Sequence, residues 1–233
     1  MAASTPLLLI ETSTEACSVA VADLVKGSWQ VLAKAEDAGP MKHTARLVPL
    51  IRAAFAKTPY AIQEVGSIGV SAGPGSYTAL RAGLSTAKGL CFATGAKLLM
   101  LPTLEAMAAC VFEQHGEYEG AVLSLINARR DEVYYATYSH QLDVLDEPAC
   151  AALSQEWVEQ RLIHGELLAT GNGATKAADY FDDGLPQVLV ELNACTLLPL
   201  AVQRIDDQRF ASLHHAVPNY IRPPYITVAK PRL

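Results

Sequence analysis

Long hydrophobic runs are missing from this sequence, and so is a basic amino-terminal segment. The apolar run at residues 7–10 has only four residues, whereas a membrane-spanning helix needs about 20 in succession. No lysine or arginine precedes Lys26, so we expect no signal peptide. The sequence therefore predicts a cytoplasmic protein that makes no use of a membrane.

Basic residues are in deficit. Eighteen lysines and arginines stand against 24 aspartates and glutamates, which gives a net charge of −6. Proteins that hold nucleic acid do so largely through clusters of basic side chains on the phosphates. We therefore do not expect this chain to hold nucleic acid tightly by itself.

The signatures of several reactive sites are also missing. The five cysteines include no CxxC pair, and an odd number without a secretion signal is typical of reduced thiols. Neither the metal motif HExxH nor the nucleophile motif GxSxG occurs. His214 and His215 lack a carboxylate at ligand spacing, and His43, a lone histidine, favours a surface or capping role. We therefore expect no metal site and no catalytic residues.

What is present is a high apolar content in a pattern of short strands and helices. Hydrophobic residues make up 51% of the 233 residues, enough for a large core without disulfides. The expected strands are 7–12, 18–23, 28–35, 68–71, 98–101, 121–126, 133–138, 166–170 and 188–190. The expected helices are 44–57, 77–93, 103–115, 154–163 and 193–205. Gly95 suits a left-handed cap at the end of the second of these.

This pattern predicts an α/β protein of two halves that meet near Pro102. Each half begins with a hairpin that has a polar tip, so the halves are candidates for distant duplicates. We expect an N-terminal subdomain at 1–102 and a C-terminal subdomain at 103–217. The proline-rich tail, 218–233, is expected to be extended.

The segment from Ser71 to Thr78 reads SAGPGSYT and links a predicted strand to a predicted helix. Two glycines, Gly73 and Gly75, permit a tight bend, and Ser76 is suited to cap the helix. Free N–H groups at a helix start attract anions, so Gly73, Gly75, Ser76 and Thr78 are candidates for a phosphate or nucleotide loop. The alternative is an ordinary turn, and the P-loop pattern GxxxxGK[ST] is absent.

Both long helices of the first half have more apolar or small surface than one core-facing side requires. In helix 44–57 the apolar arc is roughly 160°, where a core-facing stripe needs about 100°. The arc consists of Leu47, Val48, Leu50, Ile51, Ala54 and Phe55. We expect Arg46 and Arg52 at its rim and a kink at Pro49, which lies beyond the first turn.

Helix 77–93 has a surface of small residues. Gly83 and Gly89 in its interior each cost about 1 kcal/mol relative to alanine, and close approach of another backbone offsets that cost. That backbone belongs either to the protein's own sheet or to a partner, and the two can use different faces. A further polar segment, NARRDE at 127–132, is either a hairpin-tip site or a solvated turn with paired charges.

Together these motifs resemble the TsaB family, also called YeaZ. The matching segments are IETSTEACSVA at 10–20, His43 with its helix to Ile51, GPGSYTALRAGL at 73–84, AKGL at 87–90, ARRDEVY at 128–134 and PNYIR at 218–222. They follow one another in order across nearly the whole chain, and the block that starts with GPGSYT is specific.

The resemblance implies the fold of the actin-like ATPases (ASKHA), with two related α/β subdomains in a shortened and degenerate form. It implies a non-catalytic subunit of the bacterial machinery that makes threonylcarbamoyladenosine beside the tRNA anticodon. The expected partners are the catalytic subunit TsaD, a second copy of the chain when alone, and the ATPase TsaE. Transfer RNA is reached only through the complex.

On this resemblance the partner surface lies on the two long helices of the first half. Its expected residues are His43, Ala45, Arg46, Leu47, Leu50, Ile51, Ala54, Leu80, Arg81, Gly83, Leu84, Ala87 and Lys88. No tightly bound cofactor is expected, but the resemblance leaves room for ATP or ADP at the interface with TsaD.

Two positions depart from the family pattern, which usually has aspartate at both. Glu11 ends the first strand, and Asn127 precedes the Ala-Arg-Arg segment. A neutral amide does not supply the charge that holds Mg²⁺ beside phosphates, so we expect no ATP hydrolysis by this chain alone. The alternative function is an active nucleotide-using phosphotransferase of the actin-like fold, favoured by the 73–78 loop and the two polar hairpins. A peptidase is a further alternative, but the sequence offers it neither a nucleophile nor a metal.

Overall fold

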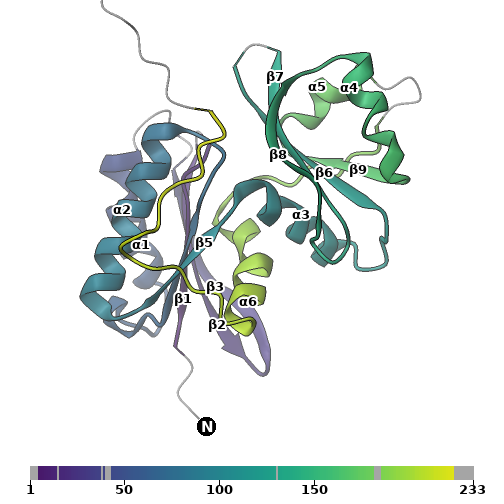
Figure 1. The fold of residues 1–233 in the computed structure, drawn as a ribbon. Coiled ribbons are helices and arrows are strands. Elements are labelled where there is room, and N and C mark those ends of the chain that lie inside the picture. The colour runs from purple at the N-terminus through teal and green to yellow at the C-terminus, as the bar shows by residue number, and fades with distance from the viewer. Residues whose placement is uncertain are drawn as a thin grey trace, which may run out of the picture.

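The computed structural model describes residues 5–14, 16–37, 39, 43–129, 131–180 and 185–222. These residues form two lobes, each built on one mixed sheet (Figure 1). The first sheet contains β1 (Leu7–Glu11), β2 (Cys17–Val25), β3 (Ser28–Asp37), β4 (Ser67–Ser71) and β5 (Lys97–Leu101). The second contains β6 (Ala121–Asn127), β7 (Glu132–Tyr138), β8 (Val144–Ala152) and β9 (Leu167–Thr170).

Six α-helices and three 3₁₀ turns are described. The helices are α1 (His43–Phe55), α2 (Tyr77–Thr94), α3 (Thr103–Gln114), α4 (Gln155–Glu159), α5 (Ala174–Ala178) and α6 (Leu198–Asp206). The 3₁₀ turns are η1 (Ile62–Glu64), η2 (Leu162–His164) and η3 (Ala194–Leu197). None of the described helices is both long enough and apolar enough to cross a membrane.

The two sheets share one topology. The strand orders are β3-β2-β1-β4-β5 and β8-β7-β6-β9. In each, three antiparallel strands form a meander, and the first of them also pairs with a parallel strand, β1 with β4 and β6 with β9. The prediction of two related α/β subdomains is therefore confirmed.

The second lobe has the same topology as the first, but with fewer strands and shorter helices among the described residues. Where the first sheet has β5, the second has only an isolated parallel bridge between Ala169 and Gln187. The predicted strand 188–190 is therefore wrong, because just one residue pair bonds there. The helix that follows the parallel strand has 18 residues in the first lobe, α2, and five in the second, α5.

Other differences from the sequence prediction also fall in the later part of the chain. The predicted helix 154–163 divides into α4 and η2, and helix 193–205 divides into η3 and α6. Strand β8 and helix α5 were not predicted. In the first half, the predicted kink position Pro49 lies inside α1, which continues through it. Helix α2 ends at Gly95, which has the left-handed conformation with a φ of 77° and matches the predicted cap.

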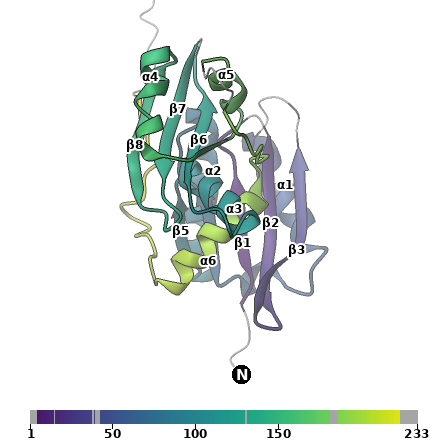
Figure 2. The ribbon, with the colours of Figure 1, turned by 90° about the vertical axis from the view of Figure 1, so that its right-hand side faces the viewer.

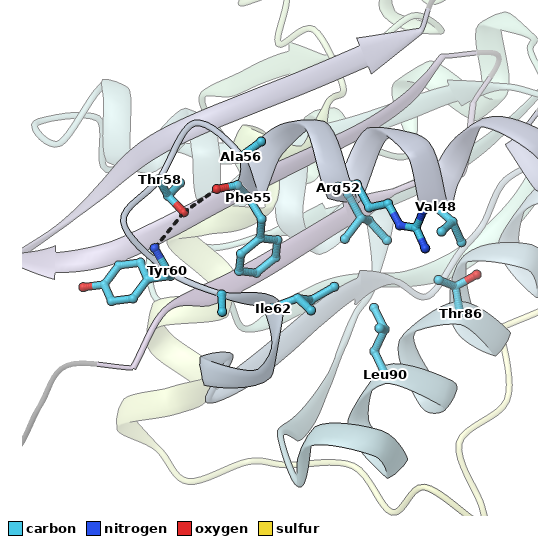
Figure 3. A pocket seen from close by; sticks show the side chains of 11 residues that line it. Val48, Arg52, Phe55, Ala56, Thr58, Tyr60, Ile62, Thr86 and Leu90 are labelled. Atoms are coloured by element: carbon cyan, nitrogen blue, oxygen red, sulfur yellow. Dashed lines mark hydrogen bonds between the residues drawn. The ribbon is translucent and has the colours of Figure 1, made fainter.

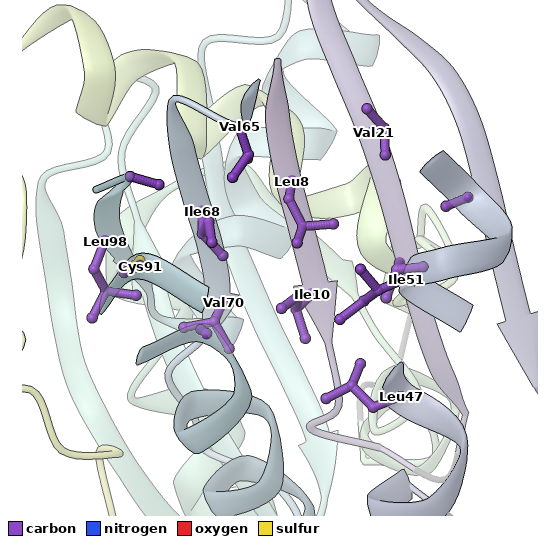
Figure 4. Packing of buried hydrophobic residues seen from close by; sticks show 14 of the residues in the cluster. Leu8, Ile10, Val21, Leu47, Ile51, Val65, Ile68, Val70, Cys91 and Leu98 are labelled. Carbon is purple, nitrogen blue, oxygen red and sulfur yellow. The ribbon is translucent and has the colours of Figure 1, made fainter. Parts of the chain in front are cut away.

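The first sheet is buried on both faces, which explains the apolar run in β1. Side chains of a strand alternate between faces. Leu8 and Ile10 pack under α1 and α2, whereas Leu7 and Leu9 pack on the side of η3 and α6. Figure 4 shows the first of these clusters, with Leu47 and Ile51 of α1 directed at β1 and β2.

The chain returns to the first lobe after building the second. Turn η3 contacts the first sheet, α6 contacts β5, and α3 packs against both α6 and β6 (Figure 2). After α6 the chain runs along the first lobe, where the Ala211 amide bonds to the Leu98 carbonyl of β5 at 2.8 Å. The boundaries 1–102, 103–217 and 218–233 stay a prediction, and residues 223–233 of the predicted tail lie outside the described residues.

Candidate functional site: a helical face and a covered loop

Helices α1 and α2 lie together on one face of the first sheet, with their outer sides toward solvent (Figure 1). Their inner sides fill the core. The predicted partner residues that are buried there are Leu47, Ile51, Ala54, Leu80, Gly83, Leu84 and Ala87. As placed, these side chains have no surface to offer a partner, and they support the two helices from behind.

The remaining predicted partner residues lie on the outer side or its rim. Ala45, Arg46 and Arg81 are exposed, and Leu50 and Lys88 are half-buried. Arg46 is paired with Asp37 at the end of β3, at 3.0 Å between Nε and Oδ2. The side chain of His43 lies outside the described residues.

The structure adds outer-face residues that were absent from the predicted set. Val48 of α1 is 47% exposed and Phe92 of α2 is 87% exposed. Gly89, one turn before Phe92, has no atom within 4 Å of the place where a Cβ would stand. The exposed or half-exposed positions Arg81, Ser85, Lys88, Gly89 and Phe92 recur at helical spacing, which is the sequence signal for this face.

A groove of about 530 Å³ lies between the two helices (Figure 3). It is lined by Val48, Ile51, Arg52, Phe55, Ala56, Thr58, Tyr60, Ala61, Ile62, Thr86 and Leu90. Its floor is mainly apolar, and Arg52 brings a cation to its edge. The Thr58 hydroxyl donates to the Phe55 carbonyl at 2.9 Å and accepts from the Tyr60 amide at 3.3 Å, which fixes the chain at one end of the groove.

The predicted anion loop is closed by the chain's own backbone. The Ser76 amide donates to the Ser13 carbonyl at 2.7 Å, so this helix-start N–H is occupied. Gly75 lies so close to Ser13 that a Cβ would overlap its carbonyl oxygen. Gly73, with a φ of 99°, lies under Asn219, whose carbonyl oxygen would be 2.6 Å from a Cβ. Of the four candidates, only Ser76 and Thr78 are exposed.

Glu11, which ends β1, has no exposed surface. One carboxyl oxygen accepts a hydrogen bond from the Ser13 amide, and the other meets no hydrogen-bond partner among the residues that the structure describes. Burial raises the pKa of the Glu11 carboxyl, against the lowering effect of its hydrogen bonds. The side chain faces inward, where burial disfavours its charged form.

Asn127, which ends β6, uses its amide within the second lobe. Its backbone N–H donates to the Asn172 side-chain oxygen, and its side-chain NH₂ donates to the Asn172 carbonyl, both at 2.8 Å. The turn around Asn172 is held close, because a Cβ on Gly171 would overlap the Leu125 carbonyl. The amide of Asn127 and the turn at Asn172 are thus bonded to each other.

These groups do not fit a magnesium nucleotide held by this chain alone. Such a site needs free carboxylates for the ion and free N–H groups for the phosphates. Glu11 is turned inward, the side chain of Asn127 is neutral and bonded, and the Ser76 N–H is taken. In the described part of the chain, no group of three or more His, Cys, Asp or Glu side chains is placed to hold a metal.

Comparisons with known proteins agree with this architecture. The family model "TsaD: tRNA N6-adenosine threonylcarbamoyltransferase" matches residues 38–182. The chain is 29% identical to the tRNA threonylcarbamoyladenosine biosynthesis protein TsaB of Escherichia coli K12, over 93% of this chain and 94% of that protein.

Two solved structures show the fold. A Pseudomonas aeruginosa protein described as similar to peptidase YEAZ has a TM-score of 0.78 at 26% identity, over 94% of this chain and all of that one. An inorganic polyphosphate/ATP-glucomannokinase from Arthrobacter sp. strain KM has a TM-score of 0.52 at 14% identity, over 88% of this chain and 100% of that one. This likeness supports the actin-like ATPase fold alone. The chain therefore belongs to the TsaD family of tRNA N6-adenosine threonylcarbamoyltransferases and, within it, to the TsaB (YeaZ) group.

Proposed function

We propose that this chain is a non-catalytic subunit that docks onto TsaD and supports the threonylcarbamoylation of tRNA adenosine. The observation that carries the proposal is the outer face of α1 and α2, with its apolar groove, the exposed Val48 and Phe92, and the open Gly89. Large exposed apolar surfaces on a folded protein mark sites of association.

The size of this face suits a helical partner. A stable protein–protein interface buries roughly 1,600 Å² in total, about half on each side. Two parallel helix faces of 13 and 18 residues supply much of such an area. Gly89 permits the backbone of a partner to approach α2 closely, because nothing in the described part of this chain occupies that space.

A non-catalytic role is supported by the state of the two strand ends. The groups that would have to carry a reaction, Glu11 and Asn127, are bonded inside their own lobes. The alternative, an active nucleotide-using phosphotransferase, has no specific observation in its favour. Titration of the isolated chain with ATP and Mg²⁺ separates the two, since micromolar binding with turnover would favour the enzyme.

Docking is tested by charge insertion into the face. We expect Phe92→Glu and Val48→Glu each to weaken binding to TsaD by about tenfold or more, because each buries a carboxylate in an apolar contact. The measurement is co-purification with TsaD and the yield of modified tRNA in a reconstituted reaction. Leu24→Glu is the matched control, because Leu24 is 45% exposed but lies on the β2–β3 hairpin.

The expected result is loss with the two helix variants and wild-type behaviour with Leu24→Glu. Equal binding by all three variants would refute the docking face. We further propose that the free chain pairs with a second copy through the same face, so Phe92→Glu should also shift a dimer to monomer in analytical ultracentrifugation. Association of TsaE with the assembled pair, and ATP or ADP at its interface, stay predictions.

A further inference from the structure

The carboxy-terminal motif PNYIR at 218–222 is not used by the docking face, yet it makes contacts with both lobes. After α6 the chain passes along β5 and α2 and ends beside both lobes, as the yellow segment of Figure 1 shows. On the way, Leu213 and Ala216 pack against the core of the first lobe. The residues just before the motif are therefore already packed on the first lobe.

The first anchor lies over the covered loop. The Asn219 amide donates to the Ala72 carbonyl at 2.7 Å, and the Asn219 carbonyl lies over Gly73. The Gly73 carbonyl in turn accepts from the Thr103 amide at 2.9 Å, at the crossing from β5 to α3. Gly73 is buried in this arrangement, so the tail and the interlobe crossing enclose the loop from two sides.

The second anchor is a three-part stack on the first turns of α2. The rings of Tyr220 and Tyr77 lie with centroids 4.7 Å apart. The Arg81 guanidinium lies 4.2 Å from the Tyr77 ring centroid, and its Nε donates to the Tyr220 hydroxyl at 3.0 Å. Ring stacking and a cation over a ring are both favourable, so the stack and the hydrogen bond together hold Tyr220 on α2.

The third anchor crosses to the second lobe. Both terminal nitrogens of Arg222 bond to the two carboxylate oxygens of Glu132, at 2.7 and 2.8 Å. Glu132 begins β7, directly after the polar segment that follows Asn127. A bidentate pair of this kind fixes the orientation as well as the distance of its partners.

We propose that residues 218–222 act as a clasp between the two lobes. The clasp covers the Gly73–Pro74 bend, grips the start of α2 through Tyr220, and holds the β6–β7 hairpin through Arg222. Release of Tyr220 and Arg222 would remove this link between the lobes and expose the loop to solvent. None of these contacts requires a partner, although Arg81 also lies at the edge of the proposed docking face.

Amide hydrogen exchange on the full-length protein tests the clasp. The amides to follow are those of Asn219 and Thr103, under conditions where exchange reports the opening equilibrium. We expect Tyr220→Ala to speed exchange at both amides by about tenfold or more, because stacking and hydrogen bond are lost together. Tyr220→Phe keeps the ring and should speed it only about two- to fivefold.

Charge reversal tests the ion pair between Arg222 and Glu132, which links the tail to the second lobe. Arg222→Glu and Glu132→Arg should each speed exchange at these amides about two- to fivefold, and the double variant should return it close to wild type. Asp37→Lys is the matched control, because it breaks the Arg46–Asp37 pair inside the first lobe. The two pairs have side chains of similar exposure, 53% and 27% against 48% and 27%.

Two results would overturn the proposal. One is a loss of protection that is not specific to the pair. The double variant would then exchange these amides as fast as the single variants do, or Asp37→Lys would speed exchange as much as Arg222→Glu does, and either result would mean a general loss of stability. The other is an unchanged radius of gyration for Tyr220→Ala in small-angle X-ray scattering, which would mean that the lobes do not depend on the tail. Thermal unfolding checks that each variant is folded.

Discussion

The inner and outer faces of helix α2 both carry glycine, but for different reasons. Gly83 faces the sheet, where a Cβ would stand 2.5 Å from the Thr12 hydroxyl oxygen and 3.4 Å from a methyl of Val70. Gly89 faces solvent, where a Cβ would meet nothing within 4 Å. The first glycine is required by this chain's own packing, and the second is not.

Under the function proposed above, this difference separates folding from association within one helix. In the sequence, both positions show the same penalty of about 1 kcal/mol relative to alanine. The neighbouring atoms show that close approach to Thr12 and Val70 offsets the penalty at Gly83, whereas no described neighbour offsets it at Gly89. Substitutions at Gly83 should therefore lower the stability of the fold, whereas bulky substitutions at Gly89 should weaken binding to a partner.

The largest effect is expected on the inner face. Gly83→Leu should lower the free energy of unfolding by about 3 kcal/mol or more, because the new side chain overlaps Thr12 in a packed interior. Urea denaturation followed by circular dichroism measures it. Gly83→Ala should be milder, and adding Thr12→Ala should recover part of its loss, since the Thr12 hydroxyl has no hydrogen-bond partner in the described residues. An unaffected Gly83→Leu protein would contradict the packing described.

The next effect is expected on the outer face, in binding. Gly89→Trp should leave the urea midpoint close to wild type but weaken TsaD binding by roughly tenfold or more, which corresponds to about 1.4 kcal/mol. The reason is steric exclusion of a backbone that approaches α2. Calorimetric titration measures the affinity. If Gly89→Trp bound TsaD as wild type does, the outer glycine would have no role in association.

A pH experiment probes Glu11 at the end of β1, the strand that α2 covers with its inner face. Burial raises the pKa of Glu11 above its ordinary value of 4.5, so the folded state holds that proton more tightly than the unfolded chain does. Stability from this group is therefore complete below the unfolded pKa and falls as the pH rises through the folded pKa, by at most about 1.4 kcal/mol per pH unit. Glu11→Gln should flatten this part of the profile in urea denaturation between pH 4 and pH 8. An identical slope in both proteins would show that another group titrates.

The smallest effect sharpens the contrast on the outer face. Gly89→Ala should raise the free energy of unfolding by up to about 1 kcal/mol, because alanine favours the helix and its methyl group meets open space. Thermal unfolding measures the gain. A loss of stability at this position would mean that Gly89 has a structural role within the chain.

Much of the first lobe could be predicted from periodicity and end signals. The apolar run of β1, the start of α3 at Thr103 and the Gly95 cap are local features, and the structure has them where expected. Strand β8 was missed because its sequence, VLDEPACAA, contains proline and acidic residues, and its pairing comes from β7. Its structure depends on a neighbour, which local propensity does not represent.

The candidate site was only half visible in the sequence. The arc on α1 indicated surplus surface, but the sequence did not separate the buried Leu47 from the exposed Val48 as contact residues. The loop at Gly73 looked open to an anion because its cover, Asn219, lies far away along the chain. Contacts over such separations follow from topology, and neither spacing nor composition reports them.

The return of η3 and α6 to the first sheet has a consequence for the order of synthesis. Leu197, Leu200 and Ala201 have no exposed surface and complete the face of the first sheet that holds Leu7 and Leu9. A ribosome makes Leu200 193 residues after Leu7, so one apolar face of the amino-terminal sheet stays uncovered while the intervening residues are synthesised. Nascent chains of this protein should therefore remain dependent on chaperones until Leu200 has left the ribosome.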